Sequence, residues 1–252
     1  MISIEKFNLF VLIWIGIAVL IFPVTLFITA PYGRHSKSTW GPMINNRVAW
    51  ILMEIPALLL FVWMVIEARG LSNLVVVIAS FLWTAHYIHR SIIFPLRIKT
   101  AKKKMPILIM LFAVCFNFVN GFINGYWLGN FASYTNDWIF DLRFILGVIF
   151  FISGFIINKY HDKILIGLRK NSTNGYQIPF GGLFRFISCP NFLGEIIEWV
   201  GFALLTWSLP SLAFLVWTFI NLVPRALDHH KWYKSKFPEY PINRNAILPG
   251  IF

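Results

Sequence analysis

NFLGEIIEWVGFALLTWSLPSLAFLVWTFINLV, residues 191–223, is the stretch that decides the fold of this chain. It is apolar enough to lie in lipid, yet its first turns carry Asn191, Glu195 and Glu198. A carboxylate at the centre of a membrane helix costs roughly 2.5–3.5 kcal/mol on insertion scales, so these side chains must face a polar cavity, a partner or a ligand. The stretch therefore predicts membrane-spanning helices that carry a functional site.

The rest of the 252-residue chain has the composition of a polytopic membrane protein. It is 58% hydrophobic and only 13% charged, with a mean hydropathy of +0.70, which lies outside the balance of a soluble domain. Apolar runs of about 20 residues can span a bilayer. Five such runs precede the opening stretch, at residues 8–30, 48–66, 71–95, 106–125 and 138–158. Because Pro210 divides the opening stretch into two spans, we predict an all-α fold with seven transmembrane helices in a single integral membrane domain, residues 1–252.

The basic residues gather on one side of these predicted spans. One side receives the basic residues of regions 34–47, 97–104, 159–185 and 225–244. The other side receives only Lys6, Arg69 and Arg143 of the 22 basic residues. Since cytoplasmic ends collect Lys and Arg, the amino terminus is expected outside and the carboxyl terminus in the cytoplasm. The net charge of +12 therefore belongs to loops between spans, which favours the lipid bilayer and an anionic cofactor as partners and argues against nucleic acid.

Metal chemistry and the usual nucleotide motifs are not indicated. The six histidines are dispersed, and the close pairs are His86/His89 and His229/His230, so we expect no metal site. The sequence has neither a GxGxxG fingerprint after a strand nor a P-loop. A nucleotide would have to be held by other residues.

Polar side chains recur at intervals of four residues at three predicted cytoplasmic helix ends. They are Asn158 with Asp162, Asn191 with Glu195, and Arg225 with His229 and Tyr233. A spacing of four places each set on one face of its helix. The polar loop at 168–186 adds Arg169 and Tyr176. A cavity lined by amides, carboxylates and basic groups suits a phosphate-bearing nucleotide better than an inorganic ion.

Longer motifs carry a resemblance to a known family. They are WILMEIP at 50–56, HYIHR at 86–90, YQIPFGGLFRFIS at 176–188, NFLGEIIEWVGFALLTWSLP at 191–210 and RNAILPGIF at 244–252. Together they resemble the steroid 5α-reductase family over most of the chain, and point to a bacterial homologue of the animal type 2 enzyme. The resemblance implies NADPH-dependent reduction of the Δ4 double bond of a 3-oxosteroid, in a seven-helix fold with the cofactor reached from the cytosol. It implies a bacterial inner membrane for a bacterial source, and the endoplasmic reticulum in a eukaryote.

The resemblance assigns the catalytic role to Glu54 and Tyr87. These two side chains would polarise the C3 ketone of the steroid while the nicotinamide of NADPH supplies hydride to C5. Enolate charge develops on the ketone oxygen as the hydride adds, so hydrogen-bond donors aimed at that oxygen stabilise the transition state. The cofactor carries the difficult chemistry, and the protein aligns it.

The resemblance also implies a cofactor set and a substrate wall. The cofactor set is Asn158, Asp162, Arg169, Tyr176, Asn191, Glu195, Arg225, His229 and Tyr233, with Glu195 between cofactor and steroid. Trp50, Met53 and Phe192 are expected around the steroid. Met53 stands where the animal enzymes have Gln, which removes one donor near the ketone. On this assignment residues 1–105 form the substrate-side half and residues 106–252 the cofactor-binding half.

Other readings of the same residues stay open at this point. The chain could reduce another enone, enal or enoyl lipid, of the polyprenal or enoyl-CoA type, or bind a sterol without catalysis. Glu54 could belong to a structural ion pair with His89 or Arg90, and Glu198 could pair with a neighbouring span. No obligate protein partner is evident.

Overall fold

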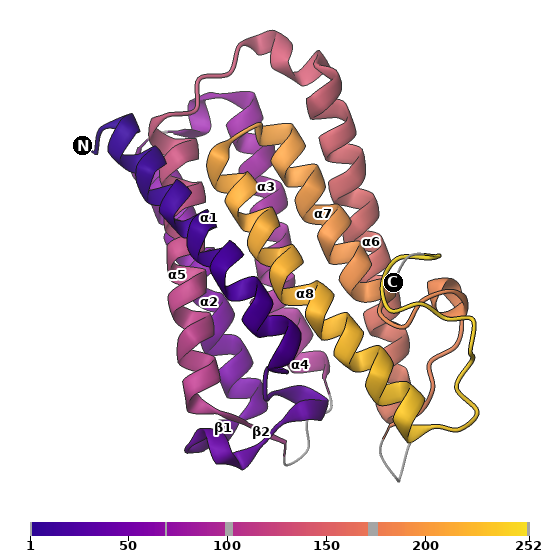
Figure 1. Cartoon of the computed structure of the whole chain (residues 1–252). Coiled ribbons are helices and arrows are strands. Elements are labelled where there is room, and N and C mark those ends of the chain that lie inside the picture. The colour runs from indigo at the N-terminus through magenta and orange to yellow at the C-terminus, as the bar shows by residue number, and fades with distance from the viewer. Residues whose placement is uncertain (1, 69, 99–102, 171–175, 251–252) are drawn as a thin grey trace.

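The computed structural model describes residues 2–68, 70–98, 103–170 and 176–250, and within them it has eight α-helices and one two-stranded ribbon (Figure 1). The helices are α1 Ile4–Phe27, α2 Asn46–Glu67, α3 Leu74–Ile88, α4 Phe94–Arg97, α5 Ile107–Asn130, α6 Leu142–Lys170, α7 Pro190–Thr206 and α8 Leu209–Lys236. The strands β1 Met43–Asn45 and β2 Lys104–Pro106 pair antiparallel. Short 3-10 turns lie at Gly33–His35, Ser38–Trp40, Gly70–Ser72, Asn136–Phe140 and Gly182–Arg185. The all-α prediction is confirmed. Arg69 and positions 99–102, which entered the charge argument, lie outside the described residues.

Five helices, α1, α2, α5, α6 and α8, are long and apolar enough to cross a membrane. Large apolar side chains stay exposed on the outside of the bundle: Leu20 in α1 is 77% exposed and Phe81 in α3 is 70% exposed. Exposed apolar surface on this scale marks contact with another apolar phase. The chain is therefore a multi-pass membrane protein.

The helices α3 and α4 are joined by a π-helical turn, His89–Ile93. The residues that flank this turn, Ile88 and Phe94, keep right-handed helical backbone angles, so positions 74–97 form one helix with a single widened turn. Widened turns of this kind occur most often at functional sites. This one carries Arg90.

Close backbone approach at glycines holds α6 against α7. A Cβ added to Gly194 would lie 2.5 Å from the backbone nitrogen of Asn158, and one added to Gly154 would overlap the backbone nitrogen of Glu198. Gly147 and Gly201 face each other in the same way one heptad farther along the two helices. Small residues let membrane helices pack backbone to backbone. The glycine seam, Gly147, Gly154, Gly194 and Gly201, thereby brings the polar stripes of α6 and α7 together.

The first helix packs against the last, as Figure 1 shows. Thr25 Oγ1 donates to the carbonyl of Ile220 at 3.3 Å, and Trp217 Nε1 donates to the carbonyl of Trp14 at 3.2 Å. The helices α2 and α5 pack extensively as well. Both contacts cross position 105, so the two expected halves of the chain interleave and are not separate packing units.

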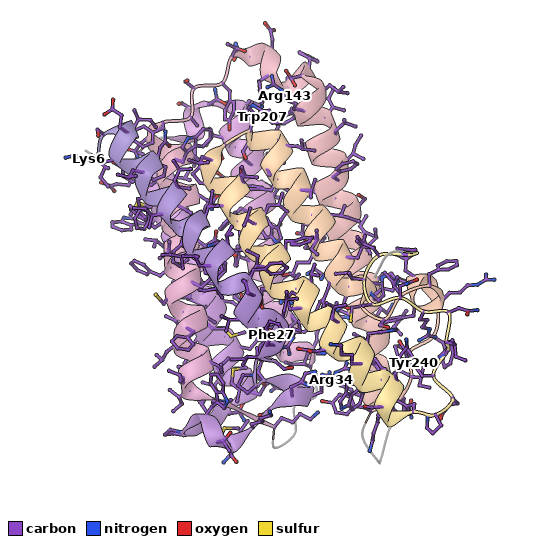
Figure 2. The ribbon with its side chains drawn as sticks, viewed as in Figure 1. Lys6, Phe27, Arg34, Arg143, Trp207 and Tyr240 are labelled. Carbon is purple, nitrogen blue, oxygen red and sulfur yellow. The ribbon has the colours of Figure 1, made fainter. Side chains whose placement is uncertain are left out.

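The two ends of the bundle differ in their side chains (Figure 2). At one end Arg143 bonds to Asp141 at 2.7 Å and lies over the ring of Trp207 at 4.9 Å. Trp207 has a left-handed φ of 43°, which makes the tight turn between α7 and α8. Arg34 and Tyr240 lie at the opposite end, beside the carboxyl-terminal part of α8 (Figure 2).

Candidate functional site

A cavity of about 450 Å³ lies inside the bundle and is lined by residues of α2, α3, α5, α6, α7 and α8 and by the segment after α1. Its volume falls within the range of small-molecule sites, about 300–1,000 Å³. All the predicted site residues line it except Asn158 and Tyr176. The structure therefore brings together residues that lie more than 180 positions apart in the sequence.

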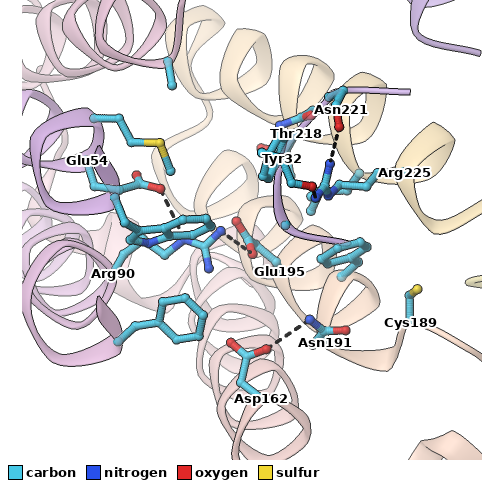
Figure 3. A pocket seen from close by; sticks show the side chains of 18 of the residues that line it. Tyr32, Glu54, Arg90, Asp162, Cys189, Asn191, Glu195, Thr218, Asn221 and Arg225 are labelled. Carbon is cyan, nitrogen blue, oxygen red and sulfur yellow. Dashed lines mark hydrogen bonds and ion pairs between the residues drawn. The ribbon is translucent and has the colours of Figure 1, made fainter. Parts of the chain in front are cut away.

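One end of the cavity holds two carboxylates that share an arginine (Figure 3). Arg90 Nε lies 3.5 Å from Glu54 Oε1, and Arg90 Nη2 lies 3.7 Å from Glu195 Oε2. The guanidinium of Arg90 also lies over the ring of Trp50, 4.9 Å from its centroid. The alternative in which Glu54 pairs with Arg90 is thus present in the structure. It does not remove Glu54 from the site, since both side chains line the cavity.

Glu54 and Tyr87 are linked through Asn117, a residue of α5 that the sequence analysis did not select. Asn117 Nδ2 donates to the backbone carbonyl of Met53 at 2.6 Å and to Glu54 Oε2 at 3.3 Å. The Tyr87 hydroxyl donates to Asn117 Oδ1 at 3.5 Å. An amide therefore does lie beside Met53, supplied by another helix.

The polar stripes of α6 and α7 meet beside the carboxylates. Asn191 Nδ2 donates to Asp162 Oδ1 at 3.0 Å (Figure 3). Asn158 Nδ2 donates to the carbonyl of Asn191 at 2.9 Å and to Glu195 Oε2 at 3.3 Å. Asn158 is 1% exposed and lies behind the cavity wall, so its contacts orient Asn191 and Glu195.

Basic and aromatic side chains surround the other end of the cavity. Arg225 Nη2 donates to the carbonyl of Tyr32 at 3.2 Å, and its guanidinium lies over the Tyr32 ring at 3.4 Å. Arg34 Nη2 donates to the Tyr233 hydroxyl at 3.3 Å. Arg34 also lies over the rings of Trp232 and Tyr233. The segment after α1 thus contributes positive charge to this end of the cavity, which is otherwise built from α6, α7 and α8.

Three further predicted residues lie at this basic end. Tyr176 accepts a hydrogen bond from Lys103 Nζ at 3.0 Å, and Arg169 lies over its ring at 5.7 Å. Phe192, expected on the steroid wall, packs against the ring of His229 with centroids 5.6 Å apart. Phe192 therefore lies among residues of the cofactor set, whereas Trp50 and Met53 line the cavity along with Glu54.

His35 and His229 form a hydrogen-bonded pair at the basic end, with His35 Nε2 and His229 Nδ1 3.0 Å apart. The pKa of His35 is lowered from 6.5 to about 4, mainly by burial and in addition by the charges of Arg225 and Arg34. Lys37 acts in that direction too, while Asp228 opposes it. His35 is therefore neutral in the folded protein at pH 7, and its pair with His229 requires one ring nitrogen to donate and the other to accept.

A pH dependence of stability follows from His35. Because its pKa is lower in the folded state than in the unfolded state, the unfolded chain binds the extra proton as the pH falls from 6.5 to about 4. The contribution of His35 to stability is complete above pH 6.5 and is lost across that interval. We expect the melting temperature in detergent to fall less over this interval in His35→Gln than in the parent. Parallel melting curves for the two proteins would contradict this.

The second carboxylate of the opening stretch has a structural partner. Glu198 is fully buried, and its Oε1 lies 2.7 Å from His86 Nδ1 on α3. The expectation that Glu198 pairs with a neighbouring span is confirmed. Glu195, by contrast, lines the cavity and shares Arg90 with Glu54.

The cavity lining also includes a cysteine, Cys189. Burial raises the pKa of its thiol to about 12, so Cys189 is not a thiolate nucleophile at neutral pH.

The sequence analysis did not select five side chains that line the cavity or form a hydrogen bond with a residue that lines it. They are Tyr32, Arg34 and His35 after α1, Arg90 in the π-helical turn, and Asn117 in α5. Asn117 had a detectable signal, because Asn117, Asn120 and Asn124 form a polar stripe in an apolar run. Tyr32, Arg34 and His35 lie in an irregular connection, where no periodicity marks the side that faces the cavity.

The residues present fit a phosphate-bearing dinucleotide. Arg34, Arg169 and Arg225 supply cationic donors at one end of the cavity, and Arg34 Nη1 is buried without a hydrogen-bond partner among the described residues. Asp162, Asn191 and Glu195 supply acceptors and an amide toward the middle. Guanidinium groups suit phosphate, and carboxylates and amides suit ribose hydroxyls and a carboxamide.

Comparisons with known proteins all point to one family. The family model described as 3-oxo-5-alpha-steroid 4-dehydrogenase matches residues 103–252. The chain is 42% identical to the steroid 5-alpha-reductase DET2 of Solanum lycopersicum, over 97% of this chain and 98% of that protein. It is 39% identical to the 3-oxo-5-alpha-steroid 4-dehydrogenase 1 of Homo sapiens, over 88% of this chain and 86% of that protein. It is 41% identical to the 3-oxo-5-alpha-steroid 4-dehydrogenase 2 of Mus musculus, over 88% of each. Similarity to the plant and to the animal proteins is therefore comparable.

Proposed function

The chain belongs to the 3-oxo-5-alpha-steroid 4-dehydrogenase family, and on that basis we propose that it reduces the Δ4 double bond of 3-oxo-Δ4-steroids to give 5α-dihydrosteroids. The observation that carries the proposal is the single cavity that joins Glu54 and Tyr87 to the basic end around Arg225. Its apolar walls suit a steroid, and its polar groups fix the direction in which a ligand lies.

NADPH is the proposed reductant, bound mainly by α6, α7 and α8 together with the segment after α1. Arg34, Arg169 and Arg225 would hold its phosphates, and Asp162, Asn191 and Glu195 would hold its ribose and carboxamide groups. Tyr176, His229 and Tyr233 would complete the site, with Asn158 as support. When bound, NADPH supplies the hydride that adds to C5 of the steroid.

Tyr87 and Glu54 are the proposed electrophilic groups at the C3 carbonyl oxygen. The Tyr87 hydroxyl carries a proton and would donate it in a hydrogen bond to that oxygen, where enolate charge develops. Glu54 accepts from Arg90 and Asn117 in the structure, so it would need a proton of its own to act as a second donor. Trp50 and Met53 would pack against the steroid on the same side.

The proposed membrane arrangement has seven spans, with the amino terminus outside and the carboxyl terminus in the cytoplasm. Two further segments are counted as spans in addition to the five long helices, which makes seven. The 17 residues of α7 rise about 26 Å and positions 74–97 about 36 Å, against a hydrocarbon core of about 30 Å. The end of the bundle that carries Arg34 would face the cytosol, since basic residues gather there. NADPH would then enter from the cytosol.

The proposal is tested with the purified protein in detergent. NADPH oxidation is followed with testosterone or progesterone, and the product is identified by mass and by the configuration at C5. A 5α-dihydro product supports the proposed reaction, the proposed reductant and the proposed configuration at C5. NADPH oxidation with polyprenal or an enoyl-CoA, and none with a 3-oxosteroid, would replace the substrate and keep the reductase. Steroid binding without NADPH oxidation would leave a sterol-binding protein.

Arg169→Ala is expected to raise the KM for NADPH about tenfold, because a charge-assisted bond to a phosphate is lost. The KM for the steroid should stay within about twofold, since Arg169 lies over the ring of Tyr176 and belongs to a different helix from Glu54 and from Tyr87. Asn191→Ala should act in the same direction. The matched control is Arg185→Ala, whose guanidinium lies over Phe186 outside the cavity. A change confined to the steroid KM would misplace the cofactor.

A further inference from the structure

Three asparagines of α5 form a polar stripe beside the catalytic pair. Asn117, Asn120 and Asn124 lie three and four residues apart, on one face of the helix, and are at most 5% exposed. A buried amide costs free energy unless its hydrogen bonds are satisfied. Three of them on one face of a membrane helix therefore require partners. Among these partners are Tyr87 and Glu54.

The hydrogen bonds of this stripe connect into one chain. Asn124 Nδ2 donates to Asn120 Oδ1 at 3.0 Å. Asn120 Nδ2 donates to the Tyr87 hydroxyl at 3.1 Å, and that hydroxyl donates to Asn117 Oδ1 at 3.5 Å. Asn117 Nδ2 donates to Glu54 Oε2 at 3.3 Å. The chain therefore begins at Asn124 and ends at the Glu54 carboxylate.

Its direction is determined at both ends by acceptors that cannot donate. Asn117 Nδ2 faces the carbonyl of Met53 as well as Glu54, so the amide nitrogen must point there and the amide oxygen toward Tyr87. Asn124 Nδ2 faces the backbone carbonyl of Asn120 as well as its side-chain oxygen, so the Asn120 nitrogen must point toward Tyr87. The Tyr87 oxygen then accepts from Asn120, and its proton points toward Asn117 Oδ1, an atom of another residue that lines the cavity.

We propose that Asn117 and Asn120 are positioning residues that direct the Tyr87 hydroxyl proton toward the carbonyl oxygen of the substrate. This inference rests on the proposed function. The bond from Tyr87 to Asn117, at 3.5 Å, lies at the long limit for a hydroxyl donor, for which about 2.7–2.8 Å is usual. The proton is weakly held and free to turn to a carbonyl in the cavity. The bond from Asn120 stabilises the negative charge that Tyr87 takes on as it donates.

The test is Asn120→Leu, which keeps the approximate size of the side chain and removes the amide. We expect kcat for steroid reduction to fall about tenfold, the effect of losing one hydrogen bond to a developing charge. The KM for the steroid should stay within about twofold, because the contact is made to Tyr87 and strengthens in the transition state. The matched control is Asn130→Leu on the same helix, whose amide donates to the carbonyl of Tyr126. Its kcat should equal that of the parent.

A double-mutant cycle with Tyr87→Phe separates positioning from structural support. Adding Asn120→Leu to Tyr87→Phe should change kcat by less than about twofold, because the hydroxyl on which Asn120 acts is already gone. An equal loss in both backgrounds would overturn the inference and leave the asparagine stripe as interhelical packing. If Asn120→Leu does not fold, Asn120→Ala replaces it in the same cycle.

Failure of this inference is distinguishable from failure of the proposed function. A parent protein that oxidises no NADPH with any 3-oxosteroid contradicts the proposed function. A parent that turns over, together with an Asn120→Leu variant of unchanged kcat, contradicts only the positioning role.

Discussion

Tyr87→Phe is expected to lower kcat for steroid reduction by about 100- to 1,000-fold, the usual effect of removing one donor from an oxyanion-stabilising site. The substitution removes a single oxygen atom from a side chain that is 2% exposed and packs against Trp83 and Trp199, so the fold should persist. NADPH binding should be unchanged, since the residues proposed to hold the cofactor all lie outside α3. The measurement is steady-state turnover in detergent, with cofactor affinity measured separately.

Tyr160→Phe is the matched control for this prediction. Tyr160 lies on α6, is half exposed and lies outside the cavity lining. Glu54→Gln should also cut turnover severely, because the carboxyl group proposed to act on the C3 carbonyl oxygen is lost, while NADPH still binds and Arg90 keeps its pair with Glu195. Parent-like turnover in both Tyr87→Phe and Glu54→Gln would remove these residues from the chemistry and favour a structural ion pair.

Gly154→Val is expected to have the largest effect on stability. A Cβ at Gly154 would overlap the backbone of Glu198, and also lie 2.5 Å from the carbonyl oxygen of Gly194. Backbone atoms cannot move aside as a side-chain end can, so α6 and α7 would have to separate. We expect a loss of about 3 kcal/mol or more, at the upper end for overpacked interiors. Thermal unfolding and size-exclusion chromatography in detergent measure it.

Gly167→Val is the control on the same helix. No atom lies within 4 Å of a Cβ built at Gly167, so this substitution should leave the melting temperature close to that of the parent. Gly154→Ala should give a smaller loss than Gly154→Val in the same direction. A Gly154→Val protein as stable as Gly167→Val would mean that the glycine seam does not hold the two helices together.

Hydropathy alone predicted most of the fold. Every apolar run selected in the sequence overlaps a helix of the structure, because about 20 apolar residues in a row have few other solutions in lipid. The π-helical turn at His89–Ile93 was not predicted. A π-helical turn has no recognisable sequence pattern when the residues that flank it, here Ile88 and Phe94, are apolar. The turn carries Arg90, whose contacts with Glu54 and Glu195 are tertiary and have no local sequence pattern.

The candidate site was predictable where it lies on regular helices. Intervals of four residues selected Asn191 with Glu195 and Arg225 with His229, and these side chains all line the cavity. The same reasoning could have selected Asn117, had the analysis treated amides in an apolar run like carboxylates. Arg34 could not be found this way. It reaches the cavity because the connection after α1 folds over the end of α8, a tertiary event with no periodicity.

The contact between α1 and α8 sets an order for biogenesis. The helix α1 is synthesised before α8, which is its main packing partner, so the bonds of Trp14 and Thr25 to α8 cannot form until α8 has been made. A chain truncated before α8 would keep the contacts of α1 with α5 but lose its main packing partner, so we expect α8 to be required for α1 to assemble stably.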